Sequence, residues 1–434
     1  MKRWYLMRHG QTDYNRRRCF YGSHDVSING QGRADAKQLA LLMQEHPVDV
    51  IYTSCLKRTQ ETAQLAFPDR QVQAIADFDE RGFGQWEGLT ADEIQAAFPE
   101  VWQAWLEAPF EVTPPEAEVF SDFQTRVWAA TDRLLGSGEE SIALVAHQDK
   151  FTFKNGQTMR NRVVLAPMTI CASEPGGYVS QADIDFFARR SRSVGMVITG
   201  STYVHPLGKS FAESFSGAED DKIEGLSRLA KAIKDQGALA IVQLYHGGRM
   251  VLPDLIDGQP VAPSAVKAPR DYLAEPRALK NAEVEQVIED FLSAIRRAIQ
   301  AGFDGVELHG ANTYLIQQFV SPHSNVRQDK WGGSLNNRLR FPKTLLKRAK
   351  QLVKEEADRP FLIGYRFSPE EVEEPGIQLY DTLQLLEQLI YHQVDYLHIS
   401  TSDVWRSSIR DSQNSEPVIE KIIRKINDRV PLIG

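Results

Sequence analysis

The chain has 434 residues, of which 42% are hydrophobic and 25% charged, so it can bury sizeable cores and we expect two or three domains. Its net charge of −8, with both signs interspersed, argues against a nucleic-acid surface, and no segment approaches the roughly 20 apolar residues that a membrane helix needs. The cysteines Cys19, Cys55 and Cys171 follow no metal-binding spacing and cannot all pair, and MKRWYLMRHG holds too short an apolar run for a signal peptide. We therefore expect a cytoplasmic protein.

The first part of the chain alternates short apolar runs with amphipathic segments. The apolar runs predict strands at 4–8, 49–54 and 141–147, of which the first is expected to be buried. Apolar residues at three- and four-residue spacing predict helices at 30–45, 56–66 and 119–135. Strands that alternate with helices predict an α/β layer fold.

Polar side chains follow these predicted strands. Arg8 and His9 end the first strand, Ser54 ends the second and His147 ends the third. Because the carboxyl ends of parallel strands meet at one crevice, we expect one pocket with histidine and arginine side chains. Such a pocket suits phosphoryl transfer, since guanidinium groups match phosphate oxygens and an imidazole can act as a nucleophile. On these residues alone, His9 is equally well explained as a structural histidine at a strand end.

Four motifs in order, RHGQTDYN, YTSCLKRTQETA, ERGFGQWEG and VAH, resemble the histidine phosphatase superfamily of phosphoglycerate-mutase-like enzymes. The resemblance implies a three-layer α/β domain that acts on a phosphate ester. It also implies roles for individual residues: nucleophile for His9, phosphate clamp for Arg8, Arg58 and His147, proton donor for Glu80, and pocket residue for Asn15. Without the resemblance, Arg58 would be interpreted as an exposed helix charge and Glu80 as a solvated loop acid. Trp86 and Trp102 are interpreted as packing residues.

From residue 150 onward the chain repeats strand and helix units. Strands are predicted at 163–167, 194–200, 238–245, 305–310, 361–367, 396–400 and 430–434. Amphipathic helices separate most of them, for example at 283–301 and 337–356. Seven such units predict a (β/α)₈ TIM barrel that is one strand short.

Active residues of such barrels lie on the loops after the strands. Here the strand ends supply Thr169, Ser201, Gln243, His309, Asn312, Tyr314 and Arg366. The set holds neither an acid–base pair for hydrolysis nor a metal-ligand cluster, and it offers hydrogen-bond donors, one cation and one phenol. It fits a flat electron-accepting cofactor, because a cation stabilises negative charge on a reduced ring and a phenol can donate a proton.

The segments NGQTMRNRVVLAPMT, QLYHGGR, ELHGANTYLIQQFVSPHSNVRQDKWGGSLNNRLRF and GYRFSPEE resemble the old yellow enzyme family of FMN-dependent ene-reductases. The resemblance implies FMN and NAD(P)H as cofactors and an activated alkene, such as an enone, as substrate. It implies flavin contacts for Pro167, Met168, Thr169, Gln243 and Arg366, substrate-oxygen binding for His309 and Asn312, and proton donation for Tyr314. Cys171 is interpreted as structural.

We expect a first domain at 1–149 and a second at 150–434. The superfamily continues after its second histidine with a helix and a strand that this chain lacks, and the barrel ends at its seventh strand, before the loops that commonly hold the FMN phosphate, so we name no phosphate-binding residues. No Gly-, Ser- or Pro-rich linker joins the halves, which suggests a recombined join of two shortened genes. Open sheet edges favour pairing between chains, so homo-oligomers or aggregation are expected.

Three functions follow as alternatives. The first is NAD(P)H-dependent reduction of an activated alkene through FMN, which we favour because all residues that polarise the substrate are present. The second is phosphomonoester hydrolysis through a phosphohistidine at His9. The third is a non-catalytic chimeric chain with incomplete domains.

Overall fold

The computed structural model describes residues 3–107, 111–147, 151–192, 194–410, 415–427 and 429–434. The chain divides into two compact units, Met1–Gln148 and Asp149–Gly434, which are described separately below. The predicted domain boundary between 149 and 150 lies outside the described residues.

The first unit is built on a parallel sheet of short strands. Within the described residues it has four strands in the order β1 (Arg3–Arg8), β4 (Ser141–Ala146), β2 (Val50–Thr53) and β3 (Val72–Ala74). All its pairings are parallel, and Arg8 lies opposite Ala146 at the carboxyl end of β1. The three strands predicted from the sequence are present, and β3 was not predicted.

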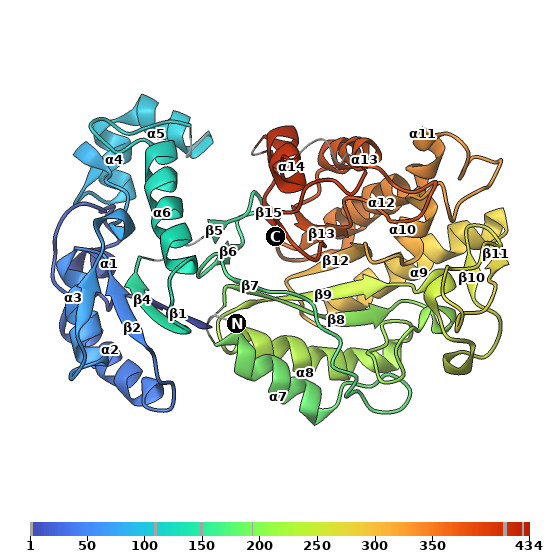
Figure 1. Ribbon diagram of the computed structural model, residues 1–434, viewed down its shortest axis with the longest axis horizontal. Coiled ribbons are helices and arrows are strands. Elements are labelled where there is room, and N and C mark those ends of the chain that lie inside the picture. Colours follow the sequence, from blue (N-terminus) through green and yellow to red (C-terminus); the bar gives the residue numbers. More distant parts are fainter. Residues whose placement is uncertain (1–2, 108–110, 148–150, 193, 411–414, 428) are drawn as a thin grey trace. The chain divides into compact units, whose positions relative to one another are not determined.

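Helices cover both faces of this sheet. On one face, Ile51, Ala143 and Val145 pack with residues of α2 (Gly30–Met43) and α3 (Lys57–Ala66). On the other, Ile142 and Leu144 pack with residues of α6 (Phe120–Leu135). Adjacent residues of each strand thus point to opposite cores, as the pleat of a strand requires. The predicted three-layer architecture and its three helices are confirmed (Figure 1).

The strand predicted at residues 4–8 is present, but the prediction that it is buried is wrong. β1 lies at the edge of the sheet and pairs with β4 alone among the described strands, and the Leu6 side chain is 58% exposed. An apolar run cannot distinguish a central strand from an edge strand, because the difference depends on the neighbour that the strand pairs with.

A separate aromatic cluster lies beside α4 (Ala91–Ala97) and α5 (Pro99–Glu107). Trp86 is fully buried, and its ring meets those of Trp102 and Phe20 at centroid distances of 5.5 and 6.0 Å. These edge-to-face contacts are typical of aromatic packing. Trp86 and Trp102 are therefore packing residues, as predicted.

The second unit is a nearly closed parallel barrel. Within the described residues its sheet has seven strands in the order β7 (Val164–Leu165), β8 (Met196–Tyr203), β9 (Leu239–Tyr245), β12 (Gly305–Gly310), β13 (Leu362–Phe367), β14 (Tyr396–Ile399) and β15 (Leu432–Ile433). Each corresponds to a predicted strand, although β7 and β15 have two residues each. The predicted TIM-barrel architecture with seven strands is confirmed.

Amphipathic helices join successive strands of the barrel and lie outside it (Figure 1). They are α7 (Gln181–Ser191), α8 (Ile223–Lys234), α9 (Asn281–Gln300), α12 (Arg340–Glu356), α13 (Leu379–Tyr391) and α14 (Val418–Ile426). In α8 the buried residues Leu226, Leu229, Ala230 and Ile233 recur at three- and four-residue spacing, so one face packs on the strands.

A short hairpin contributes to the amino-terminal end of the barrel. Its strands β5 (Phe151–Thr152) and β6 (Thr158–Met159) pair antiparallel, and Phe153 and Met159 pack against Met196 of β8 and Leu362 of β13. This end is therefore filled with apolar side chains, and the polar residues singled out from the sequence lie toward the carboxyl ends of the strands. The hairpin was not predicted.

Candidate functional sites

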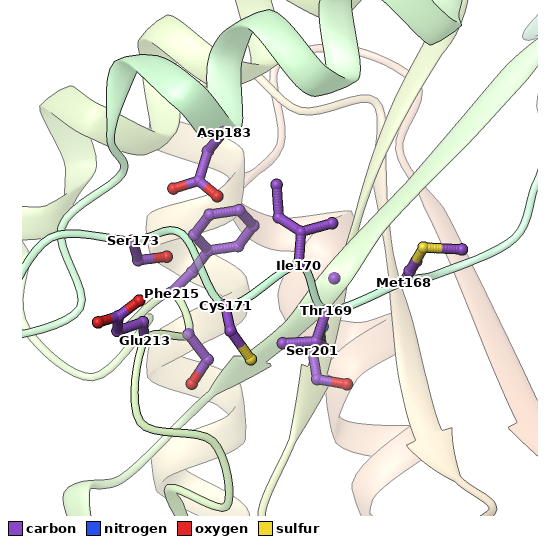
Figure 2. A pocket seen from close by; sticks show the side chains of 11 residues that line it. Met168, Thr169, Ile170, Cys171, Ser173, Asp183, Ser201, Glu213 and Phe215 are labelled. Atoms are coloured by element: carbon purple, nitrogen blue, oxygen red, sulfur yellow. Dashed lines mark hydrogen bonds between the residues drawn. The ribbon is translucent and has the colours of Figure 1, made fainter.

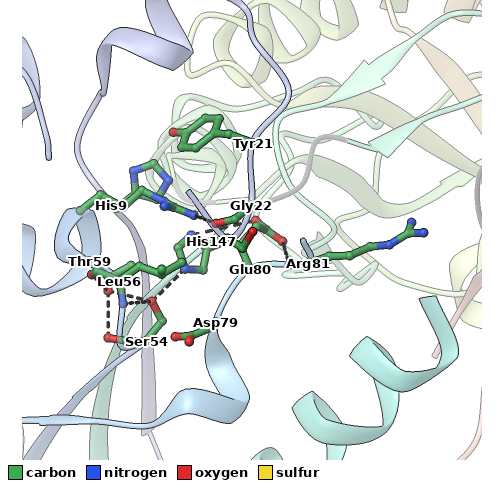
Figure 3. A network of polar contacts seen from close by, with 12 residues as sticks. His9, Tyr21, Gly22, Ser54, Leu56, Thr59, Asp79, Glu80, Arg81 and His147 are labelled. Atoms are coloured by element: carbon green, nitrogen blue, oxygen red, sulfur yellow. Dashed lines mark hydrogen bonds and ion pairs between the residues drawn. The ribbon is translucent and has the colours of Figure 1, made fainter. Parts of the chain in front are cut away.

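The polar residues at the strand ends of the first unit meet in one place. His9 and Ser54 directly follow β1 and β2, and His147 directly follows β4. The hydroxyl oxygen of Ser54 lies 2.9 Å from Nε2 of His147, and the rings of His9 and His147 have centroids 5.3 Å apart (Figure 3). The residues that the sequence predicts to share one pocket therefore lie together at these strand ends.

The tautomer of His9 follows from its backbone contact. Nδ1 lies 2.7 Å from the carbonyl oxygen of Gly10, which can only accept, so Nδ1 carries the proton and Nε2 has a free lone pair. Burial, followed by the charges of Arg58 and Arg8, lowers the pKa of His9 to about 3, although the bond to Gly10 acts in the opposite direction. The imidazole is therefore neutral at pH 7, which is the form that a nucleophile requires.

Arg58 is fully buried rather than exposed on its helix. Its Nη1 and Nη2 donate to the carbonyl oxygens of His24 and Gly22 at 2.8 and 2.6 Å, and its guanidinium lies 4.7 Å from the ring centre of Tyr21. Its Nε is buried and finds no partner among the described residues. A buried N–H without an acceptor is costly, so an anion in this pocket would satisfy it.

Glu80 lies between His147 and an open cleft. Its Oε1 accepts the backbone N–H of Arg81 at 2.9 Å, and its Oε2 lies 4.0 Å from Nδ1 of His147 (Figure 3). That Nδ1 is buried and makes no hydrogen bond within the described part of the chain. The cleft has a volume of about 430 Å³ and is also lined by Ser23, Leu56, Asp79 and Arg126. A leaving group in the cleft would lie beside the Glu80 carboxyl.

Asn15 and Arg8 have different surroundings from the histidines. The Asn15 side-chain oxygen accepts from the backbone N–H of Thr12 at 3.1 Å, which closes a capping box at α1 (Asp13–Arg17). The Thr12 hydroxyl lies 2.8 Å from the hydroxyl of Tyr21. Arg8 is exposed at the end of β1, and its charge helps to lower the pKa of His9 and of His147. Asn15 therefore shapes the loop that carries Tyr21.

Two residues that hold Arg58 were missed from the sequence. Tyr21 contacts the guanidinium through its ring, and Gly22 accepts from it through its carbonyl oxygen. A Cβ at Gly22 would collide with the backbone of Arg81, so this position requires glycine. The FYG segment could have indicated these two residues, because it places an aromatic residue next to a glycine shortly after the RHG motif.

In the second unit, the predicted residues lie on neighbouring strands in two layers. His309 of β12 lies opposite Arg366 of β13, and Arg366 lies opposite His398 of β14. Two residues before His309, toward the amino-terminal end of β12, Glu307 lies opposite Gln243 of β9. The barrel therefore brings His309, Arg366 and Gln243 together, as predicted. It also brings in Glu307 and His398, which were missed.

His309 presents a donor to the barrel opening. The backbone N–H of Ala311 donates to Nδ1 of His309 at 3.4 Å, so the proton of the neutral ring is on Nε2. Burial, followed by the charges of Arg366 and His398, lowers the pKa of His309 well below its usual value. His309 is therefore a neutral hydrogen-bond donor at pH 7.

Asn312 lies on a strained turn between β12 and α10 (Leu315–Val320). Asn312 and Thr313 have φ of 56° and 65°, which is unusual for a β-branched threonine. The Ser400 hydroxyl donates to the Asn312 side-chain oxygen at 2.8 Å, and the Asn312 backbone N–H donates to Ser368 at 3.1 Å. Because the oxygen accepts from Ser400, the amide NH₂ of Asn312 is the group available to a ligand.

Tyr314 lies against His309, with ring centroids 4.9 Å apart and the planes nearly perpendicular at 83°. Burial raises the pKa of Tyr314 to about 12, against the smaller opposing effects of Arg270 and Arg366. The phenol is therefore protonated at pH 7. Three donors, from His309 on β12 and from Asn312 and Tyr314 on the turn after it, thus lie within six residues of the sequence.

Thr169 and its neighbours lie beside β8. The Thr169 hydroxyl accepts from the backbone N–H of Ser201 at 3.1 Å, next to a cavity of about 10 Å³, which is large enough for one water molecule. Met168 also lines this cavity (Figure 2), and its side chain is 58% exposed. Pro167 is half-buried. Burial and the charges of Glu213 and Asp183 raise the pKa of Cys171, which disfavours a reactive thiolate.

These residues fit a flavin. Nε of Arg366 is buried and unpartnered in the described part of the structure, so an acceptor edge of a ring would satisfy it. Gln243 already accepts from the Ser201 hydroxyl at 3.0 Å and donates to Glu307 at 2.7 Å. Among the described residues, no group of three or more His, Cys, Asp or Glu side chains could hold a metal ion, and no helix is long and apolar enough to cross a membrane.

A parallel barrel with these donors at its carboxyl end is compatible with a flavin-dependent oxidoreductase. A sequence model of the NADH:flavin oxidoreductase / NADH oxidase family matches residues 150–433, and the chain therefore belongs to that family. A model of the histidine phosphatase superfamily (branch 1) matches residues 4–151, so the first unit carries a histidine phosphatase domain.

Several curated relatives match the second unit. The chain is 49% identical over 288 residues to an NADH:fumarate oxidoreductase of Klebsiella pneumoniae (strain 342), a match that covers 65% of this chain and 31% of that protein. It is 46% identical over 291 residues to an NADH:acrylate oxidoreductase of Vibrio harveyi, covering 66% and 29%. It is 44% identical over 287 residues to the probable NADH-dependent flavin oxidoreductase YqiG of Bacillus subtilis (strain 168), covering 66% and 77%. The chain thus spans about a third of the first two relatives.

Solved structures support the same fold. The old yellow enzyme homologue from Zymomonas mobilis has a TM-score of 0.57 and 28% identity, with 65% of this chain and 80% of that chain covered. Morphinone reductase has a TM-score of 0.55 and 26% identity, with 64% and 75% covered.

Proposed function

We propose that the second unit binds FMN and uses NADH or NADPH to reduce an activated alkene. The observation that carries the proposal is that His309 lies near the end of β12 and Asn312 and Tyr314 follow on the next turn, with the rings of His309 and Tyr314 4.9 Å apart. Membership of the NADH:flavin oxidoreductase family supports a flavin and a nicotinamide cofactor.

His309 and Asn312 bind the oxygen that activates the alkene. Nε2–H of His309 and the amide NH₂ of Asn312 donate to that oxygen, which stabilises the negative charge that it gains when hydride adds at the β-carbon. Ser400 fixes the Asn312 amide in the orientation that this role needs. Tyr314 holds the proton for the α-carbon, since its raised pKa keeps the phenol protonated.

The residues proposed to contact the flavin lie on β9, on β13 and on the segment after β7. Gln243 and Arg366 would hold the pyrimidine edge of FMN, and Pro167, Met168 and Thr169 would contact the ring from the segment after β7. The bound flavin supplies hydride transfer between the nicotinamide and the alkene. The positive charge of Arg366 suits a ring that becomes negative on reduction.

The substrate class and location extend the same proposal. Two relatives are named for fumarate and acrylate, both alkenes conjugated to a carboxyl group, and this supports a small activated alkene as the substrate. The cysteines Cys19, Cys55 and Cys171 are free thiols, which supports a reducing, cytoplasmic location.

A spectroscopic experiment tests this function. The full chain is mixed with FMN, desalted and examined for the flavin absorption bands, then reduced with NADH or NADPH without oxygen and mixed with an enone, acrylate or fumarate. We expect retained flavin, bleaching by a nicotinamide, and reoxidation by at least one alkene. A chain that retains no flavin at saturating FMN would contradict the proposal.

We propose phosphomonoester hydrolysis as a second function, carried by the first unit. The free Nε2 lone pair of His9 would attack phosphorus, and Glu80 is the candidate that protonates the departing ester oxygen. Water then cleaves the phosphohistidine and releases inorganic phosphate. The unpartnered buried nitrogens of Arg58 and His147 support binding of the phosphate, as noted above within the described residues.

Hydrolysis of p-nitrophenyl phosphate tests the second function. His9→Ala should abolish turnover and the acid-labile phosphoenzyme, because the attacking nitrogen is removed. His46→Ala is the matched control, since His46 is exposed and packs against Tyr5 with ring centroids 5.6 Å apart. Equal hydrolysis by the His9→Ala variant would rule out the phosphohistidine route.

A further inference from the structure

A buried carboxylate links three strands of the barrel below the candidate flavin site. Glu307 of β12 is fully buried. Its Oε1 accepts from Nε2 of Gln243 on β9 at 2.7 Å, and its Oε2 lies 3.0 Å from Nδ1 of His398 on β14. His398 is itself 3% exposed. The side chains thus bridge β9, β12 and β14, with β13 between the last two.

The chemistry of the carboxylate fixes the groups that face it. A carboxylate only accepts hydrogen bonds, so the Gln243 atom that faces Glu307 must be the NH₂ nitrogen. The other end of the amide agrees, because the Ser201 hydroxyl donates to the Gln243 oxygen at 3.0 Å. By the same reasoning, Nδ1 of His398 carries a proton. The positions of the oxygen and of the nitrogen of the Gln243 amide are therefore both fixed. Glu307 takes one of the two N–H groups, and the other has no partner among the hydrogen bonds of the described residues.

The charge of Glu307 also reaches Arg366. Burial lowers the pKa of Arg366, and the negative charge of Glu307 acts against that effect more than any other group does. Burial and the same carboxylate raise the pKa of Tyr396 well above its usual value. A buried charge without partners would be costly, so the contacts with Gln243 and His398 are what allow a carboxylate at this position.

We propose that Glu307 and His398 are positioning residues for the flavin: the pair orients the Gln243 amide so that its remaining N–H points to the pyrimidine edge. The inference rests on the proposed FMN function and adds two residues to it. Neither residue needs to touch the flavin, because both act through Gln243.

Flavin binding by Glu307→Gln tests the role of the pair. Glutamine has nearly the same shape but can present either an oxygen or an NH₂ group to Gln243, so the orientation is no longer imposed. A hydrogen bond to a charged group corresponds to about a ten- to hundredfold change in affinity, and we expect the FMN dissociation constant, measured by fluorescence quenching in the full chain, to rise by about that factor. We also expect the flavin midpoint potential to become more positive, because a nearby negative charge is removed.

Asp395→Asn is the matched control. Asp395 precedes β14 at the opposite end of that strand, where it accepts from Lys350 at 2.9 Å and from the backbone N–H of Ile363 at 2.7 Å. The substitution removes the same charge without contacting Gln243. We expect the FMN dissociation constant to stay within twofold of the wild-type value. We expect the flavin midpoint potential to equal that of the wild type within error. Equal affinities in the wild type and in Glu307→Gln would overturn the proposal.

A measurement on the wild-type chain tests the Glu307–His398 pair without relying on the folding of a variant. In ¹⁵N-resolved NMR of the FMN-free protein, we expect His398 to carry its proton on Nδ1 and the Gln243 side-chain NH₂ to exchange slowly with water. A His398 ring protonated on Nε2 alone, or a rapidly exchanging Gln243 amide, would overturn the pair. Failure of the wild type to bind FMN, with the NMR signature present, would refute the proposed function and the flavin role while leaving the orientation of Gln243 established.

Discussion

At the scale of single residues, two histidines are held in opposite tautomers by backbone groups. Nδ1 of His9 donates to the Gly10 carbonyl, which leaves Nε2 as a bare nitrogen. Nδ1 of His309 accepts from the Ala311 N–H, which leaves Nε2–H as a donor. Burial is the main reason that both rings are neutral at pH 7. The same side chain is therefore prepared for attack in one unit and for polarising an oxygen in the other.

Tyr314→Phe should separate the two half-reactions of the proposed reductase. The variant loses the proton for the α-carbon, and general-acid catalysis contributes about 10²- to 10⁴-fold, so alkene reduction should slow by about that factor. Flavin reduction by NADH needs no such proton and should change less than twofold. Stopped-flow absorbance of each half-reaction measures both rates.

Tyr391→Phe is the control for that experiment. Tyr391 is the last residue of α13 and is 78% exposed. The substitution removes the same hydroxyl group as Tyr314→Phe, but on a helix that is separate from the turn after β12. Both half-reactions should match the wild type. A Tyr314→Phe variant that reduces the alkene at the wild-type rate would show that another group, or water, supplies the proton.

At the scale of elements, the strands and helices that carry the sites could be predicted because periodicity and burial agree in them. All the predicted barrel strands are present, and in the first unit the polar residues after β1, β2 and β4 meet where parallel strands end. Elements defined by pairing rather than pattern were not predicted. The hairpin of β5 and β6 has two residues in each strand, and β3 has three.

Of the two missed residues, Glu307 could have been found from the alternation of side chains along a strand. Glu307 lies two residues before His309 on β12, so both side chains point to the same side of the strand. Reading that alternation would have placed Glu307 inside the barrel with His309. Its partner His398 could not have been identified in this way, because their contact depends on the register of β12, β13 and β14, which local sequence does not define.

At the scale of the whole molecule, each of the two compact units buries neutral histidines, and this makes both sensitive to acid. Burial lowers the pKa of His9 and of His246 to about 3, and holds the pKa of His147 and of His309 well below the usual 6.5. The folded rings resist protonation, whereas the unfolded rings bind protons near pH 6.5. The folded state therefore loses stability as the pH falls below about 6.5, and for His9 and His246 the loss continues to about pH 3.

Urea unfolding at pH 7 and pH 5 measures this effect. Between pH 6.5 and pH 5 each such histidine lowers the free energy of unfolding by about 2 kcal/mol, so both units should unfold at lower urea concentration at pH 5. Asp395 acts against this trend. Burial raises its pKa, so its protonation as the pH falls stabilises the folded state relative to the unfolded state. Replacing His246 by Gln removes one of the four titrating rings and should make the stability of the second unit less dependent on pH, while that of the first unit keeps its slope. Equal urea midpoints at pH 7 and pH 5, with the same pH dependence in the wild type and in His246→Gln, would contradict the low pKa of His246 in the folded state.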